Sequence, residues 1–102
     1  MKVKNKQQIL QRLSEHSDMF KELGVRKIGL FGSYVSGKQR ANSDVDLLVE
    51  FEKGKKSFRN FMRTVEFAEG LLGRDVELVT PQSLSQYIAP YINREVEYVQ
   101  TA

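Results

Sequence analysis

Two short polar motifs stand near the middle of this 102-residue chain and bring together residue types that suit phosphate and metal chemistry. Gly32-Ser33 ends one apolar run, and after nine intervening residues Ser43-Asp44-Val45-Asp46 opens the next. Two aligned carboxylates attract a hard cation such as Mg²⁺, which typically takes one or two carboxylates together with water and substrate phosphates. Gly32 lets the backbone approach a phosphate, and the Ser33 hydroxyl and the amides that open a short helix can bind its oxygens. The pair of motifs therefore indicates nucleotide chemistry.

The pairing of two strands would place these motifs side by side. Residues 27–31 and 45–49 are short apolar runs bounded by Gly, Ser and Asn, which predicts a strand at each. The connection over residues 33–43 is about as short as a parallel crossover can be, so we expect an antiparallel pair. In such a pair the end of the first strand lies beside the start of the second, which brings Gly32 next to Asp44.

Acidic and apolar residues alternate along the second strand and again over residues 75–79, which predicts a third strand. Asp44 and Asp46 would then project from one face of the sheet, and the apolar Val45, Leu47 and Val49 from the other. The helix between the second and third strands is long enough for a parallel crossover, which would bring the third strand's carboxylates to the same edge. Spacing alone does not tell whether Asp75 or Glu77 would join Asp44 and Asp46 at that edge.

The predicted order of elements is helix, strand, short helix, strand, helix, strand, helix. An amphipathic first helix ends at Gly24, and Ser57 caps a second long helix that ends at Gly73. The apolar stripe of that second helix is expected to be core, and it consists of Phe58, Phe61, Met62, Val65, Ala68 and Leu72. Pro90 interrupts the last stripe, which predicts a kink or two shorter helices over Leu84, Tyr87, Ile88, Tyr91, Ile92, Val96 and Val99.

These motifs resemble the minimal nucleotidyltransferases of the DNA polymerase β-like superfamily, in which Gly-Ser is followed by Asp-x-Asp and by a third carboxylate on a later strand. The match consists of Phe31-Gly32-Ser33, Gly37 and Ser43-Asp44-Val45-Asp46-Leu47, and the resemblance extends over nearly the whole chain. It implies an α/β (α+β) two-layer nucleotidyltransferase fold, with a small mixed three-stranded sheet packed against helices. Residues 1–102 would form a single domain.

The resemblance also implies the role of each candidate residue. The catalytic and metal-binding carboxylates would be Asp44, Asp46 and Glu77, holding one or two Mg²⁺ ions, with Glu77 favoured over Asp75. Gly32 and Ser33 would hold the triphosphate of ATP. Two positions depart from the pattern: Ser36 stands where relatives often have an arginine, and Glu77 stands where an aspartate is frequent. The side chains expected to compensate for the missing guanidinium are Lys38 and Arg40.

The size of the chain limits the choice of function. Relatives that carry a second domain for the acceptor are longer, whereas a stand-alone domain resembles the antitoxin partners of HEPN-type ribonuclease toxins. The resemblance implies transfer of AMP from ATP to a toxin tyrosine with release of pyrophosphate, that is, a protein adenylyltransferase. The alternative is a non-catalytic module of the same fold that neutralises a HEPN partner by contact.

Composition agrees with this interpretation. The net charge of +3 and the pI near 9.3 suit an acidic ligand such as a nucleotide, and cysteine is absent. With no signal-peptide pattern and no long apolar span, we expect a cytoplasmic protein without membrane or direct nucleic-acid binding. Association with itself or with another chain is left open.

Overall fold

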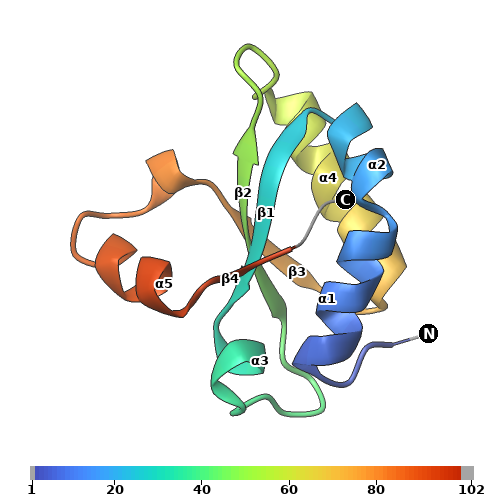
Figure 1. Cartoon of the computed structure of the whole chain (residues 1–102), viewed down its shortest axis with the longest axis vertical. Coiled ribbons are helices and arrows are strands. Elements are labelled where there is room, and N and C mark those ends of the chain that lie inside the picture. The colour runs from blue at the N-terminus through green and yellow to red at the C-terminus, as the bar shows by residue number, and fades with distance from the viewer. Residues whose placement is uncertain (1, 100–102) are drawn as a thin grey trace.

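A mixed four-stranded sheet forms the centre of the molecule, with the strand order β3-β2-β1-β4 (Figure 1). The computed structural model describes residues 2–99. The elements in chain order are α1 (Lys6–Glu15), α2 (Ser17–Glu22), β1 (Val25–Phe31), α3 (Ser33–Ser36), β2 (Val45–Phe51), α4 (Phe58–Leu72), β3 (Val76–Val79), the 3₁₀ helix η1 (Pro81–Ser83), α5 (Ala89–Glu95) and β4 (Glu97–Tyr98). The mixed α/β architecture expected from the sequence is confirmed.

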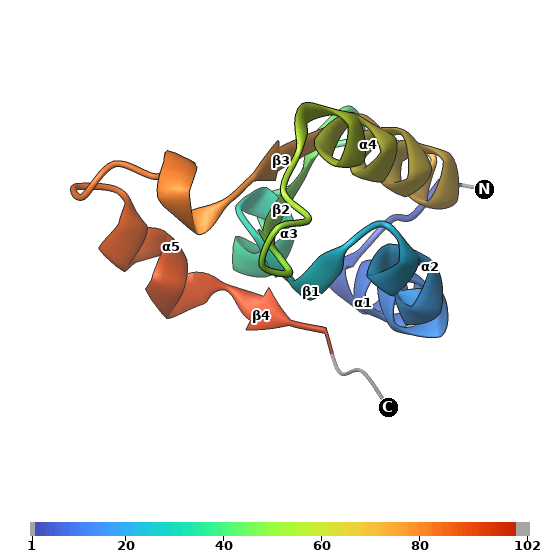
Figure 2. The same cartoon turned by 90° about the horizontal axis from the view of Figure 1, so that it is seen from above.

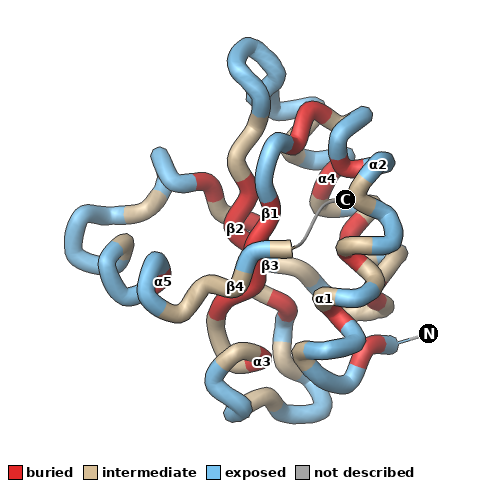
Figure 3. Tube along the Cα trace, in the orientation of Figure 1, coloured by how far each residue is buried: buried red, intermediate tan, exposed pale blue. Residues whose placement is uncertain are grey.

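The helices cover the two faces of the sheet unequally. Helices α1, α2 and α4 lie on one side, whereas α5 lies on the other (Figures 1 and 2). The larger core forms between α1, α2 and α4 and the apolar residues that alternate along the strands. Its buried residues include Ile9, Phe20 and Leu72 of the helices and Leu30 and Leu47 of the strands. A smaller cluster joins α5 to the opposite face through Phe31, Leu48 and Ile92. Figure 3 shows that the buried stretches concentrate in β1 and β2.

The strand pairing is the one that the loop lengths predict. Strand β1 pairs antiparallel with β2, which sets Phe31 opposite Asp46, and β2 pairs parallel with β3, which sets Asp46 opposite Glu77. The parallel connection runs through α4, whose N-cap Ser57 accepts a hydrogen bond from the Asn60 amide at 3.1 Å. Gly73 ends α4 in the left-handed region at φ 68°, as expected of a C-terminal glycine.

The last segment departs from the expected helix and contributes a fourth strand. Helix α5 covers only Ala89–Glu95, with Pro90 in its first turn, and the predicted stripe does not continue as a helix through Val96 and Val99. Strand β4 instead pairs antiparallel with β1, where Gly29 faces Tyr98. The cause is tertiary: β1 offers an edge with unpaired backbone groups, and a segment rich in β-branched residues satisfies them.

The first predicted helix is divided at His16. The backbone N–H of His16 donates to the Arg12 carbonyl at 3.2 Å, and Nδ1 of its ring lies 2.9 Å from the same oxygen. Its backbone leaves the helical region at φ −112° and ψ 22°, and α2 starts at the next residue. This break turns α2 so that Phe20 still packs into the core, with its ring edge against Phe67.

Helix α4 buries a face that is rotated slightly from the predicted one. Ala68 and Leu72 are buried as expected, but Phe58 is 81% exposed and Met62 is 37% exposed, while Thr64 is fully buried. Thr64 tolerates burial because its hydroxyl donates to the Asn60 carbonyl at 2.7 Å. Within residues 2–99, none of the helices combines the length and the apolar character that crossing a membrane requires.

Candidate active site

The central acidic residue of the site, Asp46, lies on β2 between two neighbouring strands. Phe31 of β1 faces it on one side and Glu77 of β3 on the other. Asp46 alternates with the buried Val45 and Leu47, so its carboxylate lies on the face that α5 partly covers. Asp44, one residue before the strand, and Glu77 are both exposed, whereas Asp46 is half-buried.

The surroundings of Asp46 oppose its ionisation. Burial, a hydrogen bond with the Glu77 side chain and the negative charges of Glu77, Asp44 and Glu95 together raise the pKa of Asp46 from 3.8 to about 7. At neutral pH Asp46 therefore keeps a proton for much of the time. A bound cation would stabilise these carboxylates in place of the proton, because it would offset their negative charges.

The donor set fits a hard divalent cation by its chemistry, since carboxylate oxygens are the ligands that such cations prefer. Asp44, Asp46 and Glu77 are the residues that would hold it, and a bound cation would relieve the repulsion that the Asp46 proton now relieves. In the part of the chain from Lys2 to Val99, no three His, Cys, Asp or Glu side chains are already grouped around a common point as metal ligands. The site thus suits a divalent cation by the chemistry of its carboxylates, and not by a preformed arrangement of ligands.

Gly32 brings the backbone against the acidic residues. Its φ of 84° and ψ of −151° lie where side chains are strained, and a Cβ at this position would fall 2.1 Å from Oδ2 of Asp46. Only glycine lets the turn pass this closely to the carboxylate. The Gly32 N–H donates to Oε1 of Glu95 at 3.0 Å, so a second carboxylate contacts the turn from α5.

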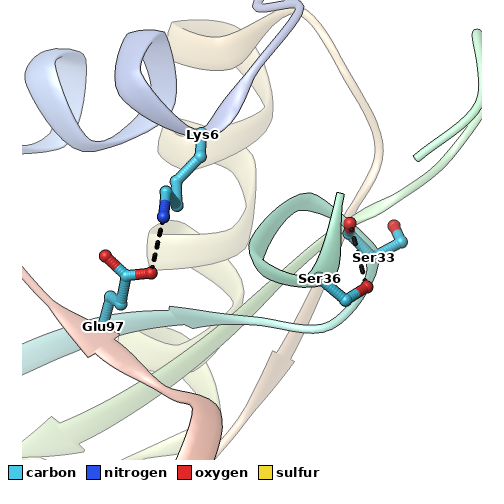
Figure 4. Close-up of polar contacts among 4 residues, drawn as sticks. All are labelled: Lys6, Ser33, Ser36 and Glu97. Atoms are coloured by element: carbon cyan, nitrogen blue, oxygen red, sulfur yellow. Dashed lines mark hydrogen bonds and ion pairs between the residues drawn. The ribbon is translucent and has the colours of Figure 1, made fainter. Parts of the chain in front are cut away.

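Ser33 opens the one-turn helix α3 directly after Gly32. Its backbone carbonyl accepts a hydrogen bond from the Ser36 hydroxyl at 3.3 Å (Figure 4). The same oxygen accepts the Lys38 amide at 3.0 Å. Ser36, where the family resemblance led us to expect an arginine, therefore closes the turn on itself and carries no charge toward the site. The Ser33 hydroxyl is free of such a bond in the described residues, and it borders the same turn that contacts Asp46.

Lys38 and Arg40 lie in the exposed connection between α3 and β2. The Arg40 amide donates to Oγ of Ser43 at 2.8 Å, which shapes the chain just before Asp44. Neither cationic side chain forms an ion pair with the acidic residues, as far as residues 2–99 are concerned. The two are near the site in the chain, but the fold leaves their charges in solvent.

Asp75 is the other carboxylate that spacing allowed as the third acidic residue of the site. It stands two residues before Glu77, just before β3 begins. Its carbonyl accepts the Val45 amide at 2.9 Å, and its charge is not one of those that shift the pKa of Asp46. Arg74 fixes this edge, since Nε donates to the Val3 carbonyl at 2.7 Å and Nη1 to the Ala41 carbonyl at 2.6 Å. Arg74 and Asp75 also line a shallow hollow of about 230 Å³, together with Lys2, Asn42, Asp44 and Gly73.

Sequence reasoning missed Glu95 altogether. It belongs to α5, 63 positions after Gly32, and no motif connects the two. Only the pairing of β4 with β1 brings the end of α5 to the turn, and β4 itself was not predicted. No signal within the sequence alone would have selected Glu95 from the other acidic residues.

Comparison with known proteins gives a consistent assignment. The family model of the nucleotidyltransferase domain matches residues 8–99. A protein of Thermococcus cleftensis named protein adenylyltransferase MntA is 47% identical over 88 residues, which are 85% of this chain and 88% of the relative. A protein of Methanocaldococcus jannaschii, provisionally named a protein adenylyltransferase, is 34% identical over 97 residues, covering 93% and 94% of the two chains.

Solved structures show the same fold. One provisionally assigned as a minimal nucleotidyltransferase superposes with a TM-score of 0.79 at 29% identity, covering 92% of this chain and 95% of that one. A toxin–antitoxin crystal structure with AMP-PNP matches at a TM-score of 0.71 and 21% identity, over 91% and 73% of the chains. A tri-AMPylated Shewanella oneidensis HEPN toxin in complex with its MNT antitoxin matches at a TM-score of 0.63 and 18% identity, again over 91% and 73%.

The fold and the enzyme class expected from the sequence are thereby confirmed. The Gly-Ser turn and the carboxylates Asp44 and Asp46 lie within the matched region, and the two relatives described above are named as enzymes of this class. This chain belongs to the nucleotidyltransferase domain family.

Proposed function

We propose that this chain transfers AMP from ATP to a tyrosine hydroxyl of a HEPN-type toxin and thereby acts as its antitoxin. The support is the adenylyltransferase name of the relative that shares 47% of aligned residues, and a solved neighbour that contains an AMPylated HEPN toxin. The proposed reaction takes place in the cytoplasm, the compartment that supplies ATP. No second domain is invoked, because the partner itself provides the acceptor.

In the proposed reaction the acceptor oxygen attacks the α-phosphorus of ATP and forms a new P–O bond. The bond from that phosphorus to the bridging oxygen breaks, and pyrophosphate leaves with its electron pair. The acceptor's proton passes to a base, for which Glu77 is the candidate because its exposed carboxylate lies beside Asp46. Every atom of ATP is thus accounted for in the modified partner and in pyrophosphate.

The chain's own residues would divide the work of positioning. Asp44, Asp46 and Glu77 would hold Mg²⁺, which when bound supplies positive charge against the triphosphate oxygens. Gly32 would bring its turn close to a phosphate, and the Ser33 hydroxyl would donate a hydrogen bond to it. Lys38 and Arg40 are proposed to attract the nucleotide from the flanking loop.

The observation that carries the proposal is the convergence of three separate strands at Asp46. Gly32, directly after β1, and Glu77 on β3 both lie against the Asp46 carboxylate of β2, and this proximity supports the proposed phosphate-binding role of the turn and the proposed metal-binding role of the carboxylates. An acidic group of this kind has no structural benefit of its own, because its members repel one another.

The decisive experiment incubates the chain with a purified HEPN partner, ATP and Mg²⁺ and follows the mass of the partner. We expect increments of about 329 Da, the mass of a transferred AMP, and loss of the partner's ribonuclease activity. The variant with Asp44→Asn and Asp46→Asn together should show no increment and no Mg²⁺-dependent ATP binding. Asp18→Asn, the same chemical change on the exposed surface of α2, serves as the control and should leave the increments unchanged.

A different result would assign the chain to the non-catalytic module. If the doubly substituted chain neutralised the partner completely, and no mass increment arose with the unmodified chain under any condition, contact alone would explain the neutralisation. Metal-dependent ATP binding that persisted in the double variant would remove these two aspartates from the site.

A further inference from the structure

The carboxylate of Glu95 is bound to the turn that the proposed function assigns to the nucleotide. Oε1 of Glu95 accepts the Gly32 N–H at 3.0 Å. Gly32 is the N-cap of α3 and has no side chain with which to cap that helix. The contact therefore fixes the turn from outside the β1–α3 segment, through an element at the far end of the chain.

The position of Glu95 follows from the register of β4. Gly29 faces Tyr98, Leu30 faces Glu97, and the Val99 amide donates to the Ile28 carbonyl at 2.9 Å. Each step forward along β1 is one step back along β4, so the same register extended beyond the strand sets residue 95 opposite residue 32. At residue 95 the chain is already helical, and its backbone carbonyl is directed along α5. The side-chain carboxylate takes the place of the carbonyl that a continuing strand would offer.

Gly32 is consequently held from two sides. On one side the Asp46 carboxylate lies where a Cβ of Gly32 would be, and on the other side Glu95 accepts its amide. The same placement adds a negative charge near Asp46, which is unfavourable, so the gain must come from the bond to the turn.

We infer that Glu95 is a positioning residue: its side chain fixes the Gly32 amide and so holds the Gly-Ser turn in the geometry that receives the phosphates. The inference deepens the proposed function and rests on it only where transfer is measured. The reach of the side chain, and not its charge, is the property that positioning requires.

Two substitutions separate reach from charge. Glu95→Gln keeps the length and an acceptor oxygen but removes the charge, whereas Glu95→Asp keeps the charge but shortens the side chain by one methylene. Glu97→Gln is the matched control, because Glu97 lies two positions further along the same segment and pairs with Nζ of Lys6 at 2.8 Å (Figure 4). It removes the same charge without touching the turn.

The first measurement is amide hydrogen exchange by NMR on the full chain without nucleotide. In Glu95→Asp the Gly32 amide should exchange about tenfold faster or more, the effect of losing a hydrogen bond to a charged group. The amide of Val49 in the centre of β2 should be unchanged. In Glu95→Gln and in Glu97→Gln the Gly32 amide should stay within about threefold of the unmodified chain, since each keeps the bond or lies outside it.

The second measurement is kcat and KM for AMP transfer to the HEPN partner. Glu95→Asp should lower kcat/KM by about tenfold or more through misplacement of the turn, and Glu95→Gln should restore most of it. If the unmodified chain transfers no AMP, the proposed function fails, and the Gly32 exchange rates still decide whether Glu95 holds the turn.

Three outcomes would overturn the inference. Gly32 exchange that is equally slow in all variants would show that Glu95 does not hold the amide. Faster exchange throughout the sheet, including Val49, would show that Glu95 serves only the stability of the fold. A Glu95→Gln variant as impaired as Glu95→Asp would show that the charge is what matters.

Discussion

Replacing Asp46 by asparagine should stabilise the metal-free protein, and the gain should depend on pH. In the folded chain the pKa of Asp46 is raised to about 7 by burial, by the hydrogen bond with Glu77 and by the neighbouring negative charges. The folded state therefore binds this proton more tightly than the unfolded state. The stability that Asp46 contributes is fully present below its ordinary pKa of 3.8 and is lost as pH rises through about 7.

The size of the effect follows from the same values. A tenfold change in proton affinity is worth about 1.36 kcal/mol, so a rise from 3.8 to about 7 corresponds to at most about 4 kcal/mol. Asp46 is only half-buried, and solvent screens its neighbours, so we expect about 1–2 kcal/mol. For a domain of this size each kcal/mol moves the melting temperature by roughly 4–8 °C.

The assay is thermal unfolding in EDTA near pH 4 and near pH 8, for the unmodified chain and Asp46→Asn. Near pH 4 the two should melt within a few degrees of each other, because Asp46 is protonated in the folded state and pH 4 lies so close to its ordinary pKa of 3.8 that unfolding releases only part of a proton. Near pH 8 the variant should melt higher by at least about 4 °C. Asp18→Asn should show no such pH-dependent difference. A difference for Asp46→Asn that is the same at both pH values would refute the reasoning.

Three further predictions concern the turn and the third carboxylate. Gly32→Ala should cost about 1–3 kcal/mol more in urea unfolding than Gly54→Ala, since both have positive φ but Gly54 faces open space; equal losses would show that the close approach is unimportant. Ser33→Ala should change stability by no more than about 0.5 kcal/mol and should weaken ATP binding measured by calorimetry; a large stability loss with unchanged binding would make this serine a structural residue. Glu77→Gln should strongly slow AMP transfer while complex formation with the partner persists, whereas Asp75→Asn should transfer normally; the reverse pattern would exchange their roles.

Much of the site's frame could be predicted because it depends on short-range constraints. The connection between Gly32 and Asp44 is too short for most parallel crossovers, so the antiparallel pairing of β1 and β2 follows from chain length. The helix between β2 and β3 similarly permits the parallel pairing that sets Asp46 opposite Glu77. Because successive side chains of a strand point to opposite faces of the sheet, the sequence then determines which side chains share a face.

The choice between Asp75 and Glu77 illustrates where such reasoning stops. Asp75 and Glu77 are two positions apart, so a strand through both would direct their side chains to the same face, and spacing treats them alike. The register with β2 sets Glu77 opposite Asp46 and leaves Asp75 at the rim near Asp44. The alternation of apolar residues excludes a shift by one residue, but a shift by two would keep the same faces, so the local pattern alone does not fix this register.

The sequence by itself determined the Gly-Ser and Asp-x-Asp motifs, the order of the main elements up to β3 and the antiparallel pairing of β1 with β2, because these depend on periodicity, turn residues and loop length. It allowed the parallel pairing of β2 with β3. Only the tertiary structure decided that a fourth strand, β4, follows α5, that Phe58 lies outside the core and that Glu95 reaches Gly32. These features depend on an open strand edge and on packing between segments far apart in the chain. Local propensity is weak compared with the free energy gained by pairing such an edge and burying apolar surface, so the fold overrides it.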